Sequence, residues 1–258
     1  MKENIKLHER ILKKEVFFNK EKWPHFDLLF NDIKKIAKKT KIEKKKVLIL
    51  ERTNLYGKIS LFLPFFDKNR TDSIDCYTEK LLFRGNYNYF LLKNPNIIKV
   101  KSKNQFHYKK LKVKKNSYDY VLITNLMHHI SEPIGLIKKV QKILKNKGKI
   151  YVFEPLVREL HQIPEDYFRY TPYGLKDLLE KNNFKLKNTK IIGGPFSSAA
   201  YYMDQSLQYL PKKIRDEHTL KFKKEYQKML NLEKKFNKNL VRKNTKSPTA
   251  FSIIAEKN

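Results

Sequence analysis

Residues 118–153, YDYVLITNLMHHISEPIGLIKKVQKILKNKGKIYVF, predict the central unit of the fold. The apolar runs at 118–124 and 149–153 are short and continuous, which is typical of strands covered on both faces of a parallel sheet. Between them, Pro133 stands where a helix favours proline, apolar residues follow at spacings of three and four, and Gly148 is expected to end the helix. The order strand, helix, strand therefore predicts a βαβ unit with parallel strands.

The same alternation continues in both directions along the chain. Helices are predicted over residues 26–37 and from Pro172 to about Asn182, where apolar side chains recur at spacings of three and four. Further strands are predicted at 47–50, 73–76, 97–100, 187–192 and 250–255. Together these elements predict an α/β fold: a Rossmann-like open sheet, mostly parallel, with helices on both faces and an antiparallel last strand beside residues 187–192.

One region interrupts this alternation. Residues 196–246 carry an apolar helical stripe in a strongly charged background, so we expect a helical insertion before the last strand. The chain is predicted to form a single domain over residues 1–258. Its expected parts are an N-terminal helical segment (1–43), a core (44–195), the insertion (196–246) and the last strand (247–258).

Composition limits the location of the protein. No run approaches eighteen consecutive apolar residues, so no membrane span is expected, and residues 1–14 are charged throughout, unlike a secretory signal. Cys76 is the single cysteine, which excludes an internal disulfide framework and fits a reducing compartment. We therefore expect a cytoplasmic protein.

The charge is strongly positive, with 57 Lys and Arg against 26 Asp and Glu and a formal net charge of +31. Lysines are spread along the chain and arginine, the better reader of base edges and phosphates, is rare. The positive electrostatic field of the protein favours anionic small-molecule partners. Nucleic acid is a less favoured partner because the lysines are not clustered and arginine is rare. The sequence does not indicate an oligomeric state.

Polar residues follow the first two predicted strands. Glu51 and Arg52 end the first strand, with Gly57 a little further on, and Asp75 ends the second, 24 residues after Glu51. Ligands of open parallel sheets bind beyond the carboxyl ends of the strands. A carboxylate at Asp75 is suitably placed to accept the hydroxyls of a ribose, or alternatively it caps the next helix or turn.

A mixed polar and apolar segment follows the strand at 118–124. Asn125 and Leu126 could line an adenine or substrate pocket. The adjacent His128 and His129 could serve as a base, as metal ligands or as hydrogen-bonded structural residues. Because no second ligand cluster is visible in the sequence, no metal site is predicted.

The loop before residue 172 carries aromatic side chains around one arginine. Tyr167, Phe168 and Tyr170 flank Arg169 directly before a well-capped helix. These residues could wall a substrate cleft by stacking and cation–π contact. Alternatively, they form a packed loop in which Arg169 binds backbone carbonyls.

The chain resembles the class I S-adenosylmethionine-dependent methyltransferases, in particular the subgroup called methyltransferase type 11. The resemblance covers residues 44–192 and the last strand. The features that carry it are the order of the elements, Asp75 at the end of the second strand, YDYV at 118–121 leading to NLMHHI at 125–130, the helix from Pro133 to KNKGK at 145–149, and YFRYTP at 167–172.

The resemblance implies an S-adenosylmethionine site at the strand ends. Asp75 would hold the ribose, and Asn125 with Leu126 would lie beside the sulfonium and the substrate. His129 matches a histidine common in the family and is a candidate base if the acceptor must lose a proton. His128 occupies a position that is acidic in the family, beside the expected substrate, which Tyr167, Arg169 and Tyr170 would also contact.

The first loop departs from the family pattern. ERTN at 51–54 stands where the family has two or three glycines, and only Gly57 remains downstream. In the family this loop holds the methionine end of the cofactor, so Glu51, Arg52 and Gly57 would do so here. Glu51 could compensate for the missing glycines by pairing with the cofactor's ammonium group.

The expected function is methyl transfer from S-adenosylmethionine to a small-molecule or carbohydrate-type acceptor by in-line displacement. In such a reaction the protein mainly positions donor and acceptor in a dry cleft. Two alternatives stay open: a non-catalytic relative that keeps the fold as a binding or scaffold module, and a basic protein that modifies nucleic acid.

Overall fold

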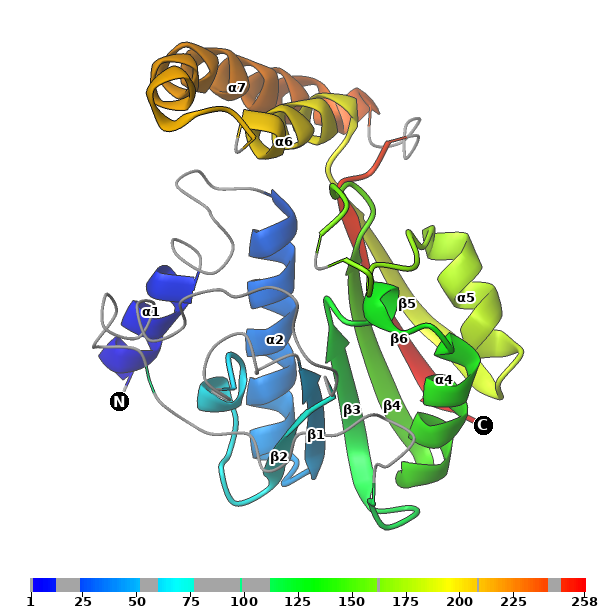
Figure 1. Ribbon diagram of the computed structural model, residues 1–258. Coiled ribbons are helices and arrows are strands. Elements are labelled where there is room, and N and C mark those ends of the chain that lie inside the picture. The colour runs from blue at the N-terminus through cyan, green and yellow to red at the C-terminus, as the bar shows by residue number, and fades with distance from the viewer. Residues whose placement is uncertain are drawn as a thin grey trace.

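The computed structural model describes residues 2–12, 24–51, 60–76, 98, 112–161, 163–207, 209–240 and 247–258. These residues form a six-stranded sheet in the order β2-β1-β3-β4-β6-β5 (Figure 1). The strands are β1 Val47–Glu51, β2 Thr71–Asp75, β3 Tyr118–Thr124, β4 Leu144–Pro155, β5 Phe184–Ile192 and β6 Ala250–Lys257. Strands β2, β1, β3 and β4 are parallel to one another, and β6 pairs antiparallel with both β4 and β5. The predicted fold class is confirmed.

Helices cover both faces of this sheet. They are α1 Lys2–Ile11, α2 Pro24–Ile42, α4 Pro133–Ile143, α5 Pro172–Glu180, α6 Pro195–Leu207 and α7 Lys212–Leu240, with short 3₁₀ turns η3 Leu63–Phe65 and η5 Met127–His129. Helix α2 covers one face, and α4 with α5 covers the other (Figure 1). Among the described helices, none has both the length and the apolar composition of a membrane span.

The continuous apolar runs of the sequence follow from this double cover. Val47 and Ile49 of β1 join the apolar cluster under α2, whereas Leu48 and Leu50 join the cluster under α4 and α5. Successive side chains of a strand point to opposite faces, so a strand buried on both faces needs apolar residues at every position. Strands β3 and β4 divide their side chains between the two clusters in the same way.

The predicted end of the helix after Pro133 is wrong. Helix α4 ends at Ile143, and Leu144 is already extended and pairs with Tyr118 of β3. Gly148 lies inside β4, at a shift of register between the two strands. A Cβ atom on Gly148 would lie 2.8 Å from the carbonyl oxygen of Lys145, so this glycine permits a close backbone approach within the strand.

Other bounds differ by smaller amounts. The second strand begins two residues before the predicted position and β5 begins at Phe184, three residues before it. Of the strand predicted at 97–100, only residue 98 lies within the described part of the chain, and it belongs to no strand there. Between β5 and β6 the chain forms α6 and α7, which pack against each other beyond the end of the sheet (Figure 1).

Candidate functional site

The order of the strands identifies one edge of the sheet as the candidate site. From β1 the chain passes to β2 on one side of β1 and later to β3 on its other side. The strand order therefore reverses between β1 and β3, and ligands of open α/β sheets bind outside the carboxyl ends of the strands at such a point. Glu51, Asp75 and Thr124 are the last residues of β1, β2 and β3, and Glu51 is the register partner of Asp75.

Glu51 is buried and fully engaged by neighbouring donors. Its Oε1 accepts hydrogen bonds from the hydroxyls of Ser60 and Ser73, and its Oε2 accepts one from the backbone N–H of Leu61 at 2.8 Å. Burial raises the pKa of Glu51 to about 7, although these hydrogen bonds oppose the rise. The carboxyl group therefore carries a proton part of the time near neutral pH, and it fixes the chain that leads into η3.

The side chains of two residues predicted to bind the cofactor, and a glycine predicted to do so, are not described. Arg52, Gly57 and the side chain of Asp75 lie outside the described part of the structure. Their roles stay predictions.

The segment after β3 is held in an unusual backbone conformation. Asn125 has a φ of 50°, in the left-handed region that asparagine tolerates better than most residues, and its N–H donates to the carbonyl of Phe153 at 2.9 Å. Leu126 is buried beside it. The Oγ1 atom of Thr124 is buried and has no hydrogen-bond partner within the described structure. A buried hydroxyl of this kind at the strand end is one that a bound ligand can satisfy.

Glu154 fixes the loop after β3 to the end of β4. This fully buried carboxylate accepts hydrogen bonds at Oε1 from the N–H groups of Leu126 and Met127, at 3.0 and 2.8 Å. At Oε2 it accepts one from Nδ1 of His128 at 2.5 Å. This role of Glu154 was not predicted from the sequence. The available signal was an acidic residue directly after a buried strand, at the sheet edge that binds ligands.

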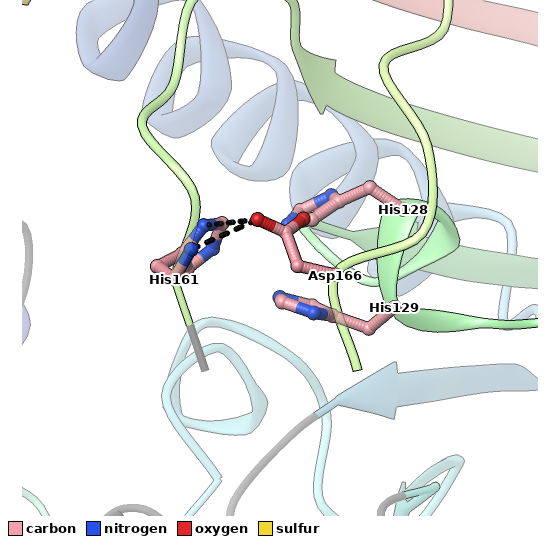
Figure 2. A group of neighbouring side chains, drawn as sticks. All are labelled: His128, His129, His161 and Asp166. Carbon is pink, nitrogen blue, oxygen red and sulfur yellow. Dashed lines mark hydrogen bonds and ion pairs between the residues drawn. The ribbon is translucent and has the colours of Figure 1, made fainter. Parts of the chain in front are cut away.

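Four side chains that could ligate a metal meet beside this loop. Figure 2 shows the carboxylate of Asp166 facing the His161 ring, with His128 and His129 next to it. The centroid of the His128 ring lies 3.9 Å from that of His129 and 5.3 Å from that of His161. The sequence analysis considered the adjacent histidine pair but missed His161 and Asp166. Both come from the loop after β4, and no spacing in the sequence connects them with η5.

The pKa values of His161 and Asp166 are both lower than usual. Burial, with the nearby positive charge of Arg158, lowers the pKa of His161 to about 3. Burial would raise the pKa of Asp166, but hydrogen bonds from Arg169 and from the N–H of His161 lower it to about 2. Near neutral pH the loop therefore holds a neutral imidazole beside an ionised carboxylate.

Arg169 is held by its own loop. Its guanidinium donates two hydrogen bonds to Asp166, at 2.6 and 2.7 Å, and one to the carbonyl of Glu159 at 2.8 Å. These contacts correspond to the second alternative considered for Arg169, a packed loop in which the arginine binds backbone carbonyls. Tyr167 is 45% exposed, and the buried hydroxyl of Tyr170 has no partner within the described structure. The role of all three in substrate binding stays a prediction.

A contact from the loop after β4 brings α6 to the same edge. Arg158 donates to the hydroxyl of Tyr201 on α6 at 2.7 Å, and Tyr201 itself is buried. Helices α6 and α7 therefore lie beyond the carboxyl ends of the parallel strands (Figure 1).

A separate cavity lies away from these strand ends. It has a volume of about 240 Å³ and is lined by α2 and the sheet face below it. Its lining includes the side chains of Lys35, Lys39, Lys149, Lys187 and Lys190. Because it contains none of the strand-end residues, it is distinct from the candidate site.

The strand order and the position of the site define the class I methyltransferase fold. A family model described as "Methyltransferase domain" matches residues 93–152. No curated protein sequence matches the chain. The expected resemblance to the class I S-adenosylmethionine-dependent methyltransferases is confirmed at the level of the fold.

Solved structures with this fold share little sequence with the chain. A putative sarcosine dimethylglycine methyltransferase from Galdieria sulphuraria has a TM-score of 0.51 at 11% identity, covering 89% of this chain and 86% of that one. A putative methyltransferase from Bacillus halodurans has a TM-score of 0.42 at 14% identity, covering 83% and 92%. An S-adenosylmethionine-dependent methyltransferase from Archaeoglobus fulgidus has a TM-score of 0.43 at 14% identity, covering 87% and 94%. At 11% identity and a TM-score of 0.51, the likeness to the first of these structures concerns the fold alone.

Proposed function

We propose that this chain is an S-adenosylmethionine-dependent methyltransferase that acts on a small-molecule or carbohydrate-type acceptor. The observation that carries the proposal is the reversal of strand order between β1 and β3, with polar groups at the carboxyl ends of both strands. We further propose a single domain over residues 1–258, and a cytoplasmic location, which the single cysteine supports.

The residues at the strand ends fit such a cofactor. The buried hydroxyl of Thr124 has no hydrogen-bond partner among the described residues, so it can bind a ligand. The carboxyl group of Glu51 already accepts hydrogen bonds from Ser60, Ser73 and Leu61, so the proposed pairing with the ammonium group of the cofactor would replace one of these donors. Asp75 would accept the ribose hydroxyls, and Asn125 and Leu126 would border the reacting centre. The cofactor would supply an activated methyl group, while these residues bind, orient and exclude water.

The proposed acceptor side lies on the loop between β4 and α5. Tyr167 and Phe168 expose 45% and 37% of their surfaces, so their rings are accessible to an acceptor. The net charge of +31 favours an anionic acceptor. His129, on η5, is the proposed base for an acceptor that must lose a proton.

Labelled S-adenosylmethionine tests the class of acceptor. The purified protein is incubated with a cell extract and methyl-labelled cofactor, and small molecules, nucleic acid and protein are then separated. We expect label in the small-molecule fraction, and we expect the Asp75→Ala variant to transfer less because its ribose contact is lost. Label confined to nucleic acid or protein would contradict the proposed acceptor. Absence of label from every fraction, with every extract tried, would favour the scaffold alternative.

A further inference from the structure

The structure holds a cluster of metal-ligating side chains, of which the proposed methyl transfer uses only His129, as a base for an acceptor that must lose a proton. We propose that His128, His129, His161 and Asp166 bind one divalent transition-metal ion of the zinc type. One ligand atom from each residue lies within 4.8 Å of the others (Figure 2). Four atoms that surround zinc tetrahedrally at about 2.1 Å lie about 3.4 Å from one another, so small rotations of the side chains close the site.

The hydrogen bonds of the three rings select the tautomer that binds metals. Nδ1 of His128 faces a carboxylate oxygen, and Nδ1 of His129 and of His161 face the carbonyl oxygens of Glu165 and Glu159, at 2.5 and 3.0 Å. Nδ1 of His161 also lies 3.1 Å from the carboxylate Oδ2 of Asp166. These oxygens accept only, so each Nδ1 carries the hydrogen and donates it. A ring that carries its one hydrogen on Nδ1 has its lone pair on Nε2. Three rings oriented by outer acceptors in this way are typical of metal-bound histidines.

The outer partners are themselves fixed. The carboxylate that orients His128 belongs to Glu154, which is fully buried and also binds two backbone N–H groups. A carboxylate that accepts a hydrogen bond from a histidine, which in turn binds the metal, is a recurrent arrangement around protein-bound zinc. The cluster therefore has supporting contacts as well as candidate ligands.

Asp166 supplies the one anionic ligand. Its Oδ2 accepts hydrogen bonds from Arg169 and from the N–H of His161, whereas its Oδ1 accepts one bond, from Arg169 at 2.6 Å. Oδ1 therefore keeps a lone pair that can bind the ion. Three imidazole nitrogens with one carboxylate oxygen suit Zn²⁺ better than Mg²⁺ or Ca²⁺, which prefer oxygen ligands.

The position of the cluster indicates what the ion would do. His128 and His129 belong to η5, directly after β3, and His161 and Asp166 belong to the loop after β4. One ion would link these two loops at the edge of the sheet that carries the candidate cofactor site. Binding of the ion does not require S-adenosylmethionine, so the metal site and the cofactor site can fail separately. The two proposals meet only at His129, because a bound ion would take the lone pair that the proposed base uses.

Metal titration of the untagged full-length protein tests this proposal. The protein is treated with a chelator, dialysed, and titrated with Zn²⁺ in competition with a chromophoric chelator, and separately with Co²⁺. We expect one Zn²⁺ per chain, a melting temperature that rises with Zn²⁺ concentration, and the visible absorption of four-coordinate Co²⁺. Absence of saturable binding of either ion would overturn the proposal.

Variants show whether the bound ion occupies this cluster. His161→Gln removes one proposed ligand, and His218→Gln on α7 removes a histidine outside the cluster. We expect Zn²⁺ affinity to fall by at least about tenfold in the first variant and to stay unchanged in the second. His129→Gln serves in place of His161→Gln if circular dichroism shows that the latter does not fold. Equal affinity in cluster and control variants would place the ion elsewhere and refute the assignment.

Discussion

Replacing Glu154 with glutamine is expected to lower the free energy of unfolding by about 3 kcal/mol. The carboxylate accepts three hydrogen bonds in a fully buried position, two from backbone N–H groups and one from His128. A glutamine oxygen can still accept the two backbone bonds, but its amino group then faces Nδ1 of His128, which also carries a hydrogen. Two buried donors would oppose each other, and the charge that strengthened all three bonds would be lost.

Urea unfolding measures this effect, and Glu256→Gln is the matched control. Glu256 also lies on a strand, β6, but its ion pairs with Lys149 and Lys187 are at the surface. Its loss is expected to leave the free energy of unfolding nearly unchanged, because exposed ion pairs contribute little. A Glu154→Gln variant that is destabilised no more than the control would show that Glu154 does not hold the loop after β3.

The second large effect is a pH dependence that originates at Glu51. Burial raises the pKa of this group to about 7 from the ordinary value of 4.5. Between these pH values the folded chain binds more protons at Glu51 than the unfolded chain, so the contribution to stability decreases as the pH rises. The stabilisation is fully present below pH 4.5 and is lost as the pH passes through about 7. The total change is about 3 kcal/mol.

Glu51→Gln isolates this contribution from the other titrating groups. Unfolding free energies of the wild type and the variant are measured from pH 4.5 to 8, with Glu43→Gln as a surface control. The difference, wild type minus Glu51→Gln, is expected to fall by about 3 kcal/mol up to pH 7 and to level off above it. A difference between wild type and Glu51→Gln that is independent of pH would mean that Glu51 titrates as an ordinary carboxyl group.

The local pattern of apolar residues was sufficient to predict the fold class, but it did not predict where several helices and strands begin and end. Val47 to Leu50 predicts a doubly covered strand because each of its positions is apolar, and the structure buries every one of them. Gly148 misled the prediction because a glycine after a helix often ends it, whereas here β4 already begins at Leu144. The pairing of Leu144 with Tyr118, a contact distant in sequence, decides that boundary.

The candidate site was predictable only in part for a related reason. Strand ends can be located from apolar runs, so Glu51 and Asp75 were placed correctly at the ends of β1 and β2. The partners of His128 could not be found in this way. Glu154 and His161 reach it only because β4 pairs with β3 and the following loop folds back over η5.

Calorimetric titration of the wild-type protein with S-adenosylhomocysteine tests the central claim most directly, namely that the carboxyl ends of β1, β2 and β3 form a cofactor site. The account predicts binding of one molecule per chain, with affinity reduced about tenfold or more in Asp75→Ala because hydrogen bonds to the ribose are lost. A well-folded wild-type protein that binds neither S-adenosylhomocysteine nor S-adenosylmethionine at millimolar concentration would contradict it.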